Sequence, residues 1–476
     1  MKIGIIGSGP GGLTVAKILT DRGFKVSIFE KGKFFSQKNG PTPYSVSEMD
    51  NKYKDKGVTV ALGKTNVNYA EGACFGGGSE VNAGLYHRTP HLILKTWKEN
   101  HGIDFADESI LRKHYEFSEK ILNIGKMPFP PPASSQKICE GASSLGWQYS
   151  EAPRWFKYET KVDKGIFSGK RQSMSEAVFP KIDKENLTLF LNTSVDRISE
   201  TKNGKVRIKF QRNCSGQKNE KLFDFVFVAC GAVGTPHLLK KSGLGSKFVG
   251  QNLRLHTSIK ATAKFKEKVN GPGAGIPVHQ VKEFLPDFSI GGSISNLPFL
   301  AAGLSDNRVN PLDLTKVWHY YATYYVAVLT GKGKVISLPL IKDPIVKFDV
   351  GEDGMRYLAT GLKKLCQLLF AAGAVEIFPS IKDFTKLQSQ QDIKSLPSTI
   401  PKRTASLMTI HMMGTCAIGN NKDSCVDLTG KLKGSKRIYV ADGSIIPTAL
   451  GVNPQGTIMA LASYLAMKFY QRYENE

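Results

Sequence analysis

A glycine-rich turn at the start of the chain carries the first recognisable chemistry. It follows an apolar run that ends at Ile6, and it reads Gly7-Ser8-Gly9-Pro10-Gly11-Gly12. Gly7 permits a tight turn, Gly9 lets the backbone approach a pyrophosphate, and Gly12 lets a helix pack closely on a strand. Glu30 ends the next expected strand, where a carboxylate binds ribose hydroxyls and disfavours a 2′-phosphate. The pattern predicts a dinucleotide site whose occupant is not NADP.

Two further segments contain residues suited to chemistry. One is Gly76-Gly77-Gly78-Ser79, and the other comprises His411-Met412-Met413-Gly414-Thr415-Cys416, Asp442-Gly443-Ser444 and Gly451-Val452-Asn453-Pro454. A neutral imidazole, with an ordinary pKa of about 6.5, is the side chain best matched to proton transfer at neutral pH. A histidine taken alone is more often a hydrogen-bonded interior residue. The order and spacing of the segments together favour a functional role for His411.

The expected secondary structure places these segments on an α/β fold. Apolar runs predict parallel strands at residues 3–6, 26–29, 187–191, 223–229 and 438–441. Residues 315–350 alternate as antiparallel strands do, and residues 354–373 have helical periodicity. Because the parallel pieces are interrupted by antiparallel material, the dinucleotide domain is expected to be discontinuous in sequence.

The length of the chain predicts two joined domains. We expect a dinucleotide-binding domain from residues 1–95, 181–258 and 404–476, and a substrate-binding domain from residues 96–180 and 259–403 of the 476. No apolar stretch approaches the ~20 residues of a membrane span. The first strand begins almost at Met1, which leaves no room for a signal peptide. The seven cysteines are scattered without a C-x-x-C pair, so we expect reduced thiols, no metal site and a cytoplasmic protein.

The formal net charge is +24. Lysines dispersed through the chain supply most of it, and no basic block with interleaved aromatic residues occurs, so no nucleic-acid partner is expected. A solvated basic surface is the favoured interpretation. Peripheral contact with an anionic membrane or an acidic partner is the alternative.

Taken in order, the motifs resemble the glucose-methanol-choline (GMC) family of FAD-dependent oxidoreductases over nearly the whole chain. The segments from Gly231 to Gly245 and from Val249 to Leu253 are similar to family signatures. The segments from Gly76 to Asn82 and from Gly451 to Pro454 are similar to the cholesterol oxidase-like branch. The resemblance implies a Rossmann-like FAD-binding domain, with an inserted substrate domain on a mostly antiparallel sheet.

The resemblance also implies which residues hold FAD. Val81 stands where some relatives carry a flavin-linking histidine, so noncovalent FAD is expected. His87 and His256 lie beside family motifs and are interpreted as structural or merely near the cofactor. The expected cofactor contacts are Gly7, Gly9, Gly12, Glu30, Gly77, Gly78, Asn82, Gly84, Val195, Asp442, Gly443, Asn453 and Pro454.

The activity that the resemblance implies is oxidation of the CH–OH group of an alcohol by hydride transfer to flavin N5. His411 occupies the catalytic histidine position and is expected to take the hydroxyl proton. Asn453 occupies the second position, where an amide orients the hydroxyl. Asn453 and Pro454 are also expected to be the N-cap and first residue of a helix whose positive end faces the flavin.

Several alternatives remain open at this point. Gln455 stands where cholesterol oxidase-like relatives carry an aromatic residue linked to oxygen access, so a dehydrogenase is favoured over a steroid oxidase that uses O2. The electron acceptor could be O2, a quinone or a redox protein. Family members that act as hydroxynitrile lyases or photodecarboxylases offer a non-redox alternative, and a basic flavoprotein that only binds a membrane or partner offers a non-enzymatic one. The sequence does not identify the alcohol.

Overall fold

The computed structural model describes residues 1–36, 39–158, 169–213, 215–271, 275–339 and 341–474. Five apolar segments form one parallel sheet in the order β23-β12-β1-β2-β8. Their bounds are β1 (Lys2–Ile6), β2 (Lys25–Phe29), β8 (Leu187–Phe190), β12 (Phe225–Val228) and β23 (Ile438–Val440). All five match strands expected from the apolar runs, except that Phe223 ends the preceding strand β11 (Lys218–Phe223).

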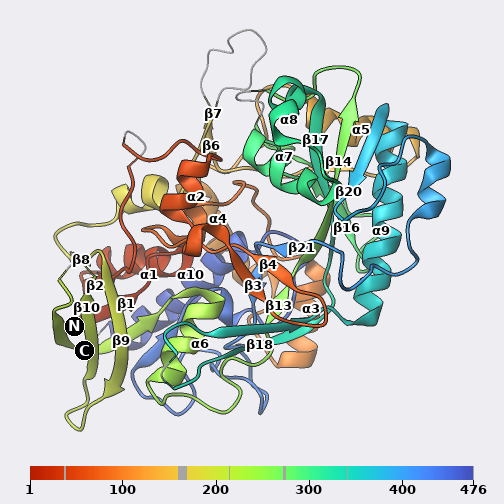
Figure 1. Cartoon of the computed structure of the whole chain (residues 1–476). Helices are drawn as coiled ribbons and strands as arrows, with labels where there is room; N and C mark the ends of the chain where they lie inside the picture. The colour runs from red at the N-terminus through yellow and green to blue at the C-terminus, as the bar shows by residue number, and fades with distance from the viewer. Residues whose placement is uncertain (37–38, 159–168, 214, 272–274, 340, 475–476) are drawn as a thin grey trace.

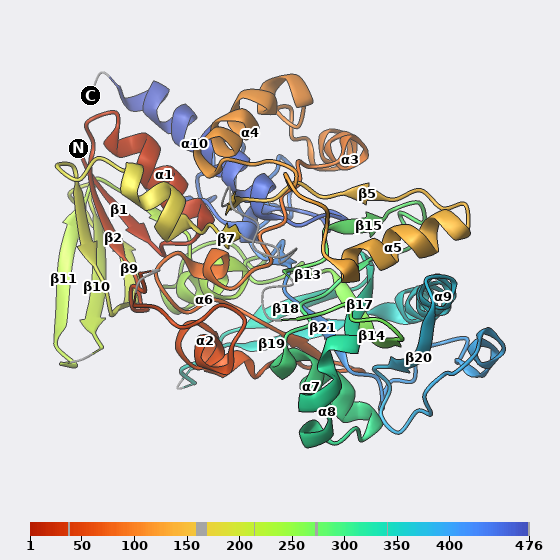
Figure 2. The ribbon, with the colours of Figure 1, turned by 90° about the horizontal axis from the view of Figure 1, so that it is seen from above.

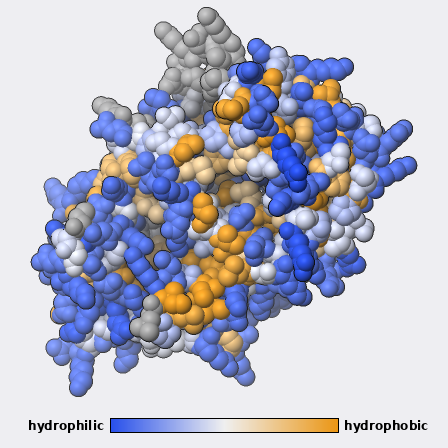
Figure 3. All heavy atoms as spheres, in the orientation of Figure 1, coloured by the Kyte–Doolittle hydropathy of each residue, from blue (hydrophilic) through white to orange (hydrophobic). Residues whose placement is uncertain are grey.

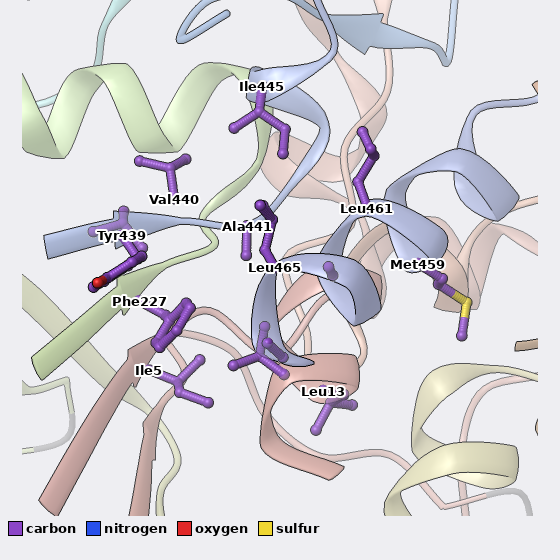
Figure 4. Close-up of a cluster of buried hydrophobic side chains, with 14 of the residues drawn as sticks. Ile5, Leu13, Phe227, Tyr439, Val440, Ala441, Ile445, Met459, Leu461 and Leu465 are labelled. Atoms are coloured by element: carbon purple, nitrogen blue, oxygen red, sulfur yellow. The ribbon is translucent and has the colours of Figure 1, made fainter. Parts of the chain in front are cut away.

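Helices cover one face of this sheet, and a three-stranded antiparallel sheet covers the other. Helix α1 (Pro10–Thr20) packs against α10 (Gln455–Tyr473), while β9 (Thr193–Glu200), β10 (Val206–Arg212) and β11 form the opposite layer, as Figure 2 shows. Side chains from the sheet, α1 and α10 meet in one apolar core, which Figure 4 shows around Phe227 and Leu465. This packing fixes the glycine-rich turn between β1 and α1.

A nine-stranded sheet forms the other half of the molecule (Figure 1). Its main path runs β3-β4-β21-β14-β17-β16-β15-β5, with β20 also paired to β14, and every pairing except β21–β4 is antiparallel. The central strands are β14 (Thr257–Phe265), β15 (His279–Val281), β16 (Ser289–Gly292) and β17 (Tyr321–Val328). One face is buried beneath α9 (Gly351–Ala371) and α5 (Ala133–Ser144), so the expected mixed fold with a mostly antiparallel second sheet is confirmed.

Packing crosses the expected domain boundaries in two places. Helix α4 (Glu108–Leu122) packs on α10, although residues 96–180 were assigned to the substrate domain. Strands β3 (Thr59–Ala61) and β4 (Val67–Tyr69) belong to the second sheet, although they precede residue 95. The boundaries themselves stay a prediction.

The other elements connect these layers. The helices are α2 (Val46–Lys52), α3 (His91–His101), α6 (Gly231–Lys241), α7 (Leu297–Leu304) and α8 (Pro311–Val317). The strands are β5 (Ser150–Glu151), β6 (Phe156–Tyr158), β7 (Gly169–Arg171), β13 (Arg254–Leu255), β18 (Lys332–Ile336), β19 (Ile345–Asp349), β20 (Ala374–Pro379), β21 (Leu407–Thr409) and β22 (Met412–Met413). Across the described residues, we find no helix with the length and apolar character needed to traverse a bilayer. The six cysteines in this part of the chain are free thiols.

Exposed apolar side chains gather near the contact between the two halves. Val58 and Leu62 flank β3, and Ile410 follows β21; all three are exposed. Figure 3 shows apolar side chains in this region of the front face. Ile410 also lines the large cavity described next, so this surface borders the mouth of the site.

Candidate active site

The glycine-rich turn, the Gly76–Asn82 segment and the C-terminal block line one cavity of about 780 Å³. Its walls include these predicted residues: Gly7, Gly9, Glu30, Gly77, Gly78, Asn82, Gly84, Val195, His411, Asp442, Gly443, Asn453 and Pro454. Gly12 does not reach the cavity. A Cβ on Gly12 would lie 2.1 Å from the carbonyl oxygen of Gly7, which is the close helix packing expected there.

Glycines leave room in the cavity for a ligand backbone. Gly7 has φ 100°, and a Cβ there would lie 2.3 Å from the Ala229 carbonyl oxygen. A Cβ on Gly9 or Gly78 would meet no atom within 4 Å, so their backbones face open space. This cradle fits the close approach of a pyrophosphate.

Two buried carboxylates border the cavity. Glu30 accepts hydrogen bonds from the Ser8 hydroxyl at 2.6 Å and from the Gly32 N–H at 2.7 Å. Asp442 accepts from the backbone N–H groups of Gly231 and Ser444, both at 2.8 Å. Burial raises the pKa of each carboxyl, and these hydrogen bonds oppose the rise. Each carboxylate oxygen has two lone pairs, so Glu30 can still accept from ribose hydroxyls.

A buried arginine holds the Gly76–Asn82 segment in place. Arg171 donates to the carbonyl oxygen of Asn82 at 2.6 Å and to the Glu48 carboxylate at 2.9 Å. The Asn82 amide donates to Oε1 of Gln455 at 2.7 Å. Gln455, which departs from the aromatic residue of cholesterol oxidase-like relatives, therefore connects this segment to the start of α10.

His411 stands between an amide and a second histidine. Its Nε2 lies 3.1 Å from Nδ2 of Asn453, and its Nδ1 lies 3.0 Å from Nδ1 of His256. Burial lowers the pKa of His411 to about 4 and holds the pKa of His256 well below its usual value. Both rings are therefore neutral at pH 7.

The backbone around His256 sets the proton positions of the pair. The N–H groups of Leu450 and Gly451 donate to Nε2 of His256 at 3.0 and 3.3 Å. Nε2 of His256 is therefore an acceptor, and its proton is on Nδ1, from which it donates to His411. A neutral His411 that accepts at Nδ1 carries its own proton on Nε2. The amide of Asn453 then turns its oxygen toward that N–H, an orientation fixed by the network because amide O and N are assigned from hydrogen bonding.

The expectation of an N-cap at Asn453 is wrong. Helix α10 begins at Gln455, Pro454 is its N-cap with αR backbone angles, and no side-chain cap hydrogen bond forms. The Asn453 side chain faces His411. The error arises because an asparagine at this position has the same sequence pattern whether its amide caps the helix or contacts another side chain.

His256 and His87 lie closer to His411 and Asn453 than the sequence indicated. His256 contacts His411 directly, and its position just after the Val249–Leu253 signature was the available signal. The side chains of Gln280 and Asn453 lie beside His87, burial lowers the pKa of His87 to about 3, and its buried Nδ1 has no hydrogen-bond partner among the described residues. Gln280 in turn donates to the Tyr325 hydroxyl at 3.3 Å. Polar side chains are thus neighbours from Asn453, past His87, to Gln280 of the nine-stranded sheet.

Comparisons with known proteins agree with this architecture. Family models for GMC oxidoreductases match residues 49–258 and 340–462, and a model for an NAD(P)-binding Rossmann-like domain matches residues 5–37. An uncharacterised GMC-type oxidoreductase, y4nJ of Sinorhizobium fredii, is 34% identical, with 97% of this chain and 93% of the relative covered. The chain belongs to the GMC oxidoreductase family.

Two other matches are a relative in sequence and a similar solved structure. Long-chain-alcohol oxidase FAO4A of Arabidopsis thaliana is 25% identical over 96% of this chain and 67% of its own. The structure of an Aspergillus oryzae RIB40 formate oxidase, studied for FAD modification, superposes with a TM-score of 0.75 at 16% identity, covering 99% and 98% of the two chains. GMC oxidoreductases are flavoproteins, so FAD is the dinucleotide that membership implies. None of these matches is a cholesterol oxidase, and that branch is not confirmed.

Proposed function

We propose that this protein oxidises the CH–OH group of an alcohol with noncovalently bound FAD. The observation that carries the proposal is the contact at 3.1 Å between His411 and Asn453 on the wall of a glycine-lined cavity. FAD, when bound, supplies the acceptor for the hydride at its N5. Oxidation of CH–OH at a flavin agrees with the family and with the alcohol oxidase among its relatives.

The cavity residues divide into two groups under this proposal. Gly7, Gly9 and Glu30 hold the adenosine and pyrophosphate end, with Val195 beside the adenine and Asp442 and Gly443 at the ribityl chain. The flavin end is bordered by Gly77, Gly78, Asn82, Gly84 and Pro454. Val81 offers no nucleophile for covalent attachment, which supports release of intact FAD on denaturation.

His411 and Asn453 hold the alcohol oxygen. In the resting proton arrangement, Nε2–H of His411 donates to the amide oxygen of Asn453, and a bound alcohol would take over this hydrogen bond with its own oxygen. To accept the hydroxyl proton, His411 needs a bare Nε2 and a proton on Nδ1. That form places a proton on Nε2 of His256, opposite two backbone N–H donors. We therefore propose that His411 acts as the base only after the pair has changed tautomer.

Anaerobic reduction of the flavin tests the function. Purified protein is mixed with alcohols of different classes in the absence of oxygen, and the oxidised flavin absorbance is followed. Bleaching by an alcohol, followed by recovery of the carbonyl product, supports the proposal. A flavin that no alcohol bleaches, or an alcohol that is cleaved without bleaching, would assign the protein to a non-redox class.

A further inference from the structure

The face of the nine-stranded sheet that α9 does not cover carries polar and charged side chains. Pairing aligns Lys260 with Tyr325, Tyr325 with Gly291, and Gly291 with Gln280 across four neighbouring strands. Residues opposite one another share a face, so these four form one row. Lys282 follows Gln280 by two residues, directly after β15 ends at Val281, and the alternation of the strand continued by one residue would place it on the same face.

This face adjoins the reacting end of the cavity. His256 immediately precedes β14 and lies two residues before Ser258 and four before Lys260. Because side chains alternate along a strand, these three residues are expected on the same face of the sheet. Gln280 and Asn453 both lie beside His87, whose buried Nδ1 has no hydrogen-bond partner in the part of the chain that the structure describes. A Cβ on Gly291 would lie 2.6 Å from the Tyr325 hydroxyl, so the tyrosine extends over the glycine toward Gln280.

No described residue gives Lys282 or Lys260 a charged partner on this face. Among the residues that the structure describes, neither amine forms a salt bridge or hydrogen bond, whereas Lys264, also on this face, pairs with Glu376 at 3.4 Å. The neighbouring Glu283 carboxylate accepts from the backbone N–H of Gln148 at 2.9 Å instead. Both free lysines are partly buried, and burial lowers the pKa of each to about 8, which leaves them protonated at neutral pH.

The charge of Lys282 reaches the reacting site. Burial is the main cause of the low pKa of His87, and the positive charge of Lys282 lowers it further. Because His87 lies beside Asn453, the ammonium is near the end of the cavity where the alcohol oxygen would lie, although Lys282 does not itself line that cavity. A partly buried ammonium without a counter-charge loses hydration that an anionic ligand can replace.

We propose that the alcohol oxidised by this protein carries an anionic group, a carboxylate or a phosphate, which Lys282 binds while His411 and Asn453 hold the hydroxyl. Lys260, three strands away and at about 4.8 Å per strand, extends the positive surface outward from Lys282. The inference rests on the proposed function, since it names the class of alcohol for the same site. It also separates this chain from a relative described as acting on long-chain alcohols.

Binding measurements on the FAD-loaded protein test this without turnover. Hexanoate, hexyl phosphate and hexanamide are titrated at pH 6.5, and the perturbation of the flavin spectrum and the thermal midpoint are recorded. We expect the better anion to bind about 10–100-fold more tightly than hexanamide, the usual range for one charge-assisted hydrogen bond. The order of hexanoate and hexyl phosphate identifies the anion.

Substitutions assign the effect to a residue. Lys282→Gln is expected to abolish the preference for the anion while leaving hexanamide binding unchanged, and Lys282→Arg to retain it. Lys260→Gln should reduce the preference by a smaller factor, and the paired Lys264→Gln serves as the control without effect. Equal binding of anion and amide by the wild type, or an anion preference that survives in Lys282→Gln, would overturn the proposal even if alcohols reduce the flavin. Failure of every alcohol to bleach the flavin would instead remove the proposed function.

Discussion

On the parallel-sheet side of the cavity, Glu30 and Asp442 are buried but accept hydrogen bonds from neighbouring backbone N–H groups. On the antiparallel side, Lys282 and Lys260 are partly buried without a counter-charge among the described residues. The first arrangement pairs its charges within the chain, and we propose that a ligand pairs those of the second. Under the proposed function, the parallel-sheet side would hold the dinucleotide and the antiparallel side would select the substrate.

The largest expected effect concerns His411, which lies between these two sides of the cavity and is proposed to take the proton. His411→Ala should slow flavin reduction by about 10²–10⁴-fold, the range for a positioned general base. Anaerobic stopped-flow with a reactive alcohol measures it, after flavin content has been checked. A near wild-type rate would show that His411 does not take the proton.

The wild-type pH profile sharpens the same point. Because burial lowers the pKa of His411 to about 4, the ring stays neutral through the range near 6.5 in which an exposed histidine titrates. We expect the reduction rate to be level between about pH 8 and 5.5 and to fall as the pH approaches 4, where protonation removes the acceptor. His411→Ala should lack this acid limb.

Glu30→Arg tests whether FAD affinity depends on the hydrogen-bonded carboxylate of Glu30. The substitution removes the acceptor for Ser8 and Gly32 and places a cation beside the ribose site, so FAD affinity should fall by about 10–100-fold. Flavin fluorescence on dilution gives the dissociation constant. Glu30→Gln, which keeps one carbonyl oxygen, should lose less, and unchanged affinity in Glu30→Arg would remove this residue from the site.

Asn453→Asp places a carboxylate where the amide contacts His411. A negative charge near the flavin opposes the charge that develops on the reduced ring, so reduction should slow by about tenfold. Protonation of the new carboxyl should restore part of the rate at low pH. Asn453→Gln is the uncharged control, and a variant whose deficit does not shrink on acidification would refute the electrostatic explanation.

The smallest rate effect is expected at His256. His256→Asn supplies an amide oxygen that can accept from Nδ1–H of His411, so both tautomers become accessible and the rate should stay within about tenfold of wild type. Nitrogen NMR of histidine-labelled protein reads the tautomer directly. The wild type should show a protonated Nε2 at His411, and a protonated Nδ1 there would contradict the proposed resting form.

The cofactor side could be predicted from the sequence because its residues are local. Gly7, Gly9 and Glu30 lie in one strand–helix–strand unit, where spacing along the chain determines position in space. The second sheet was predicted as antiparallel, but the sequence did not show which of its residues lie together on one face. The contact of His256 with His411 requires the pairing of β13 with β22, and the placement of Lys282 requires register across four strands. For Asn453, the position in the cavity was predicted and only the N-cap was wrong, because an N-cap and a site amide share one sequence pattern.

The ribbon of β13 and β22 is the short join at which the chain passes from the cofactor half into the antiparallel half, and it carries His256 and His411 at its edge. The histidine pair that we propose to handle the proton is thus attached to the junction between the two halves. Residues such as Lys282 and Lys260 can be exchanged for others while the ribbon is left untouched. Substitutions on the sheet face could therefore be used to change the alcohol that is accepted while the two histidines stay in place.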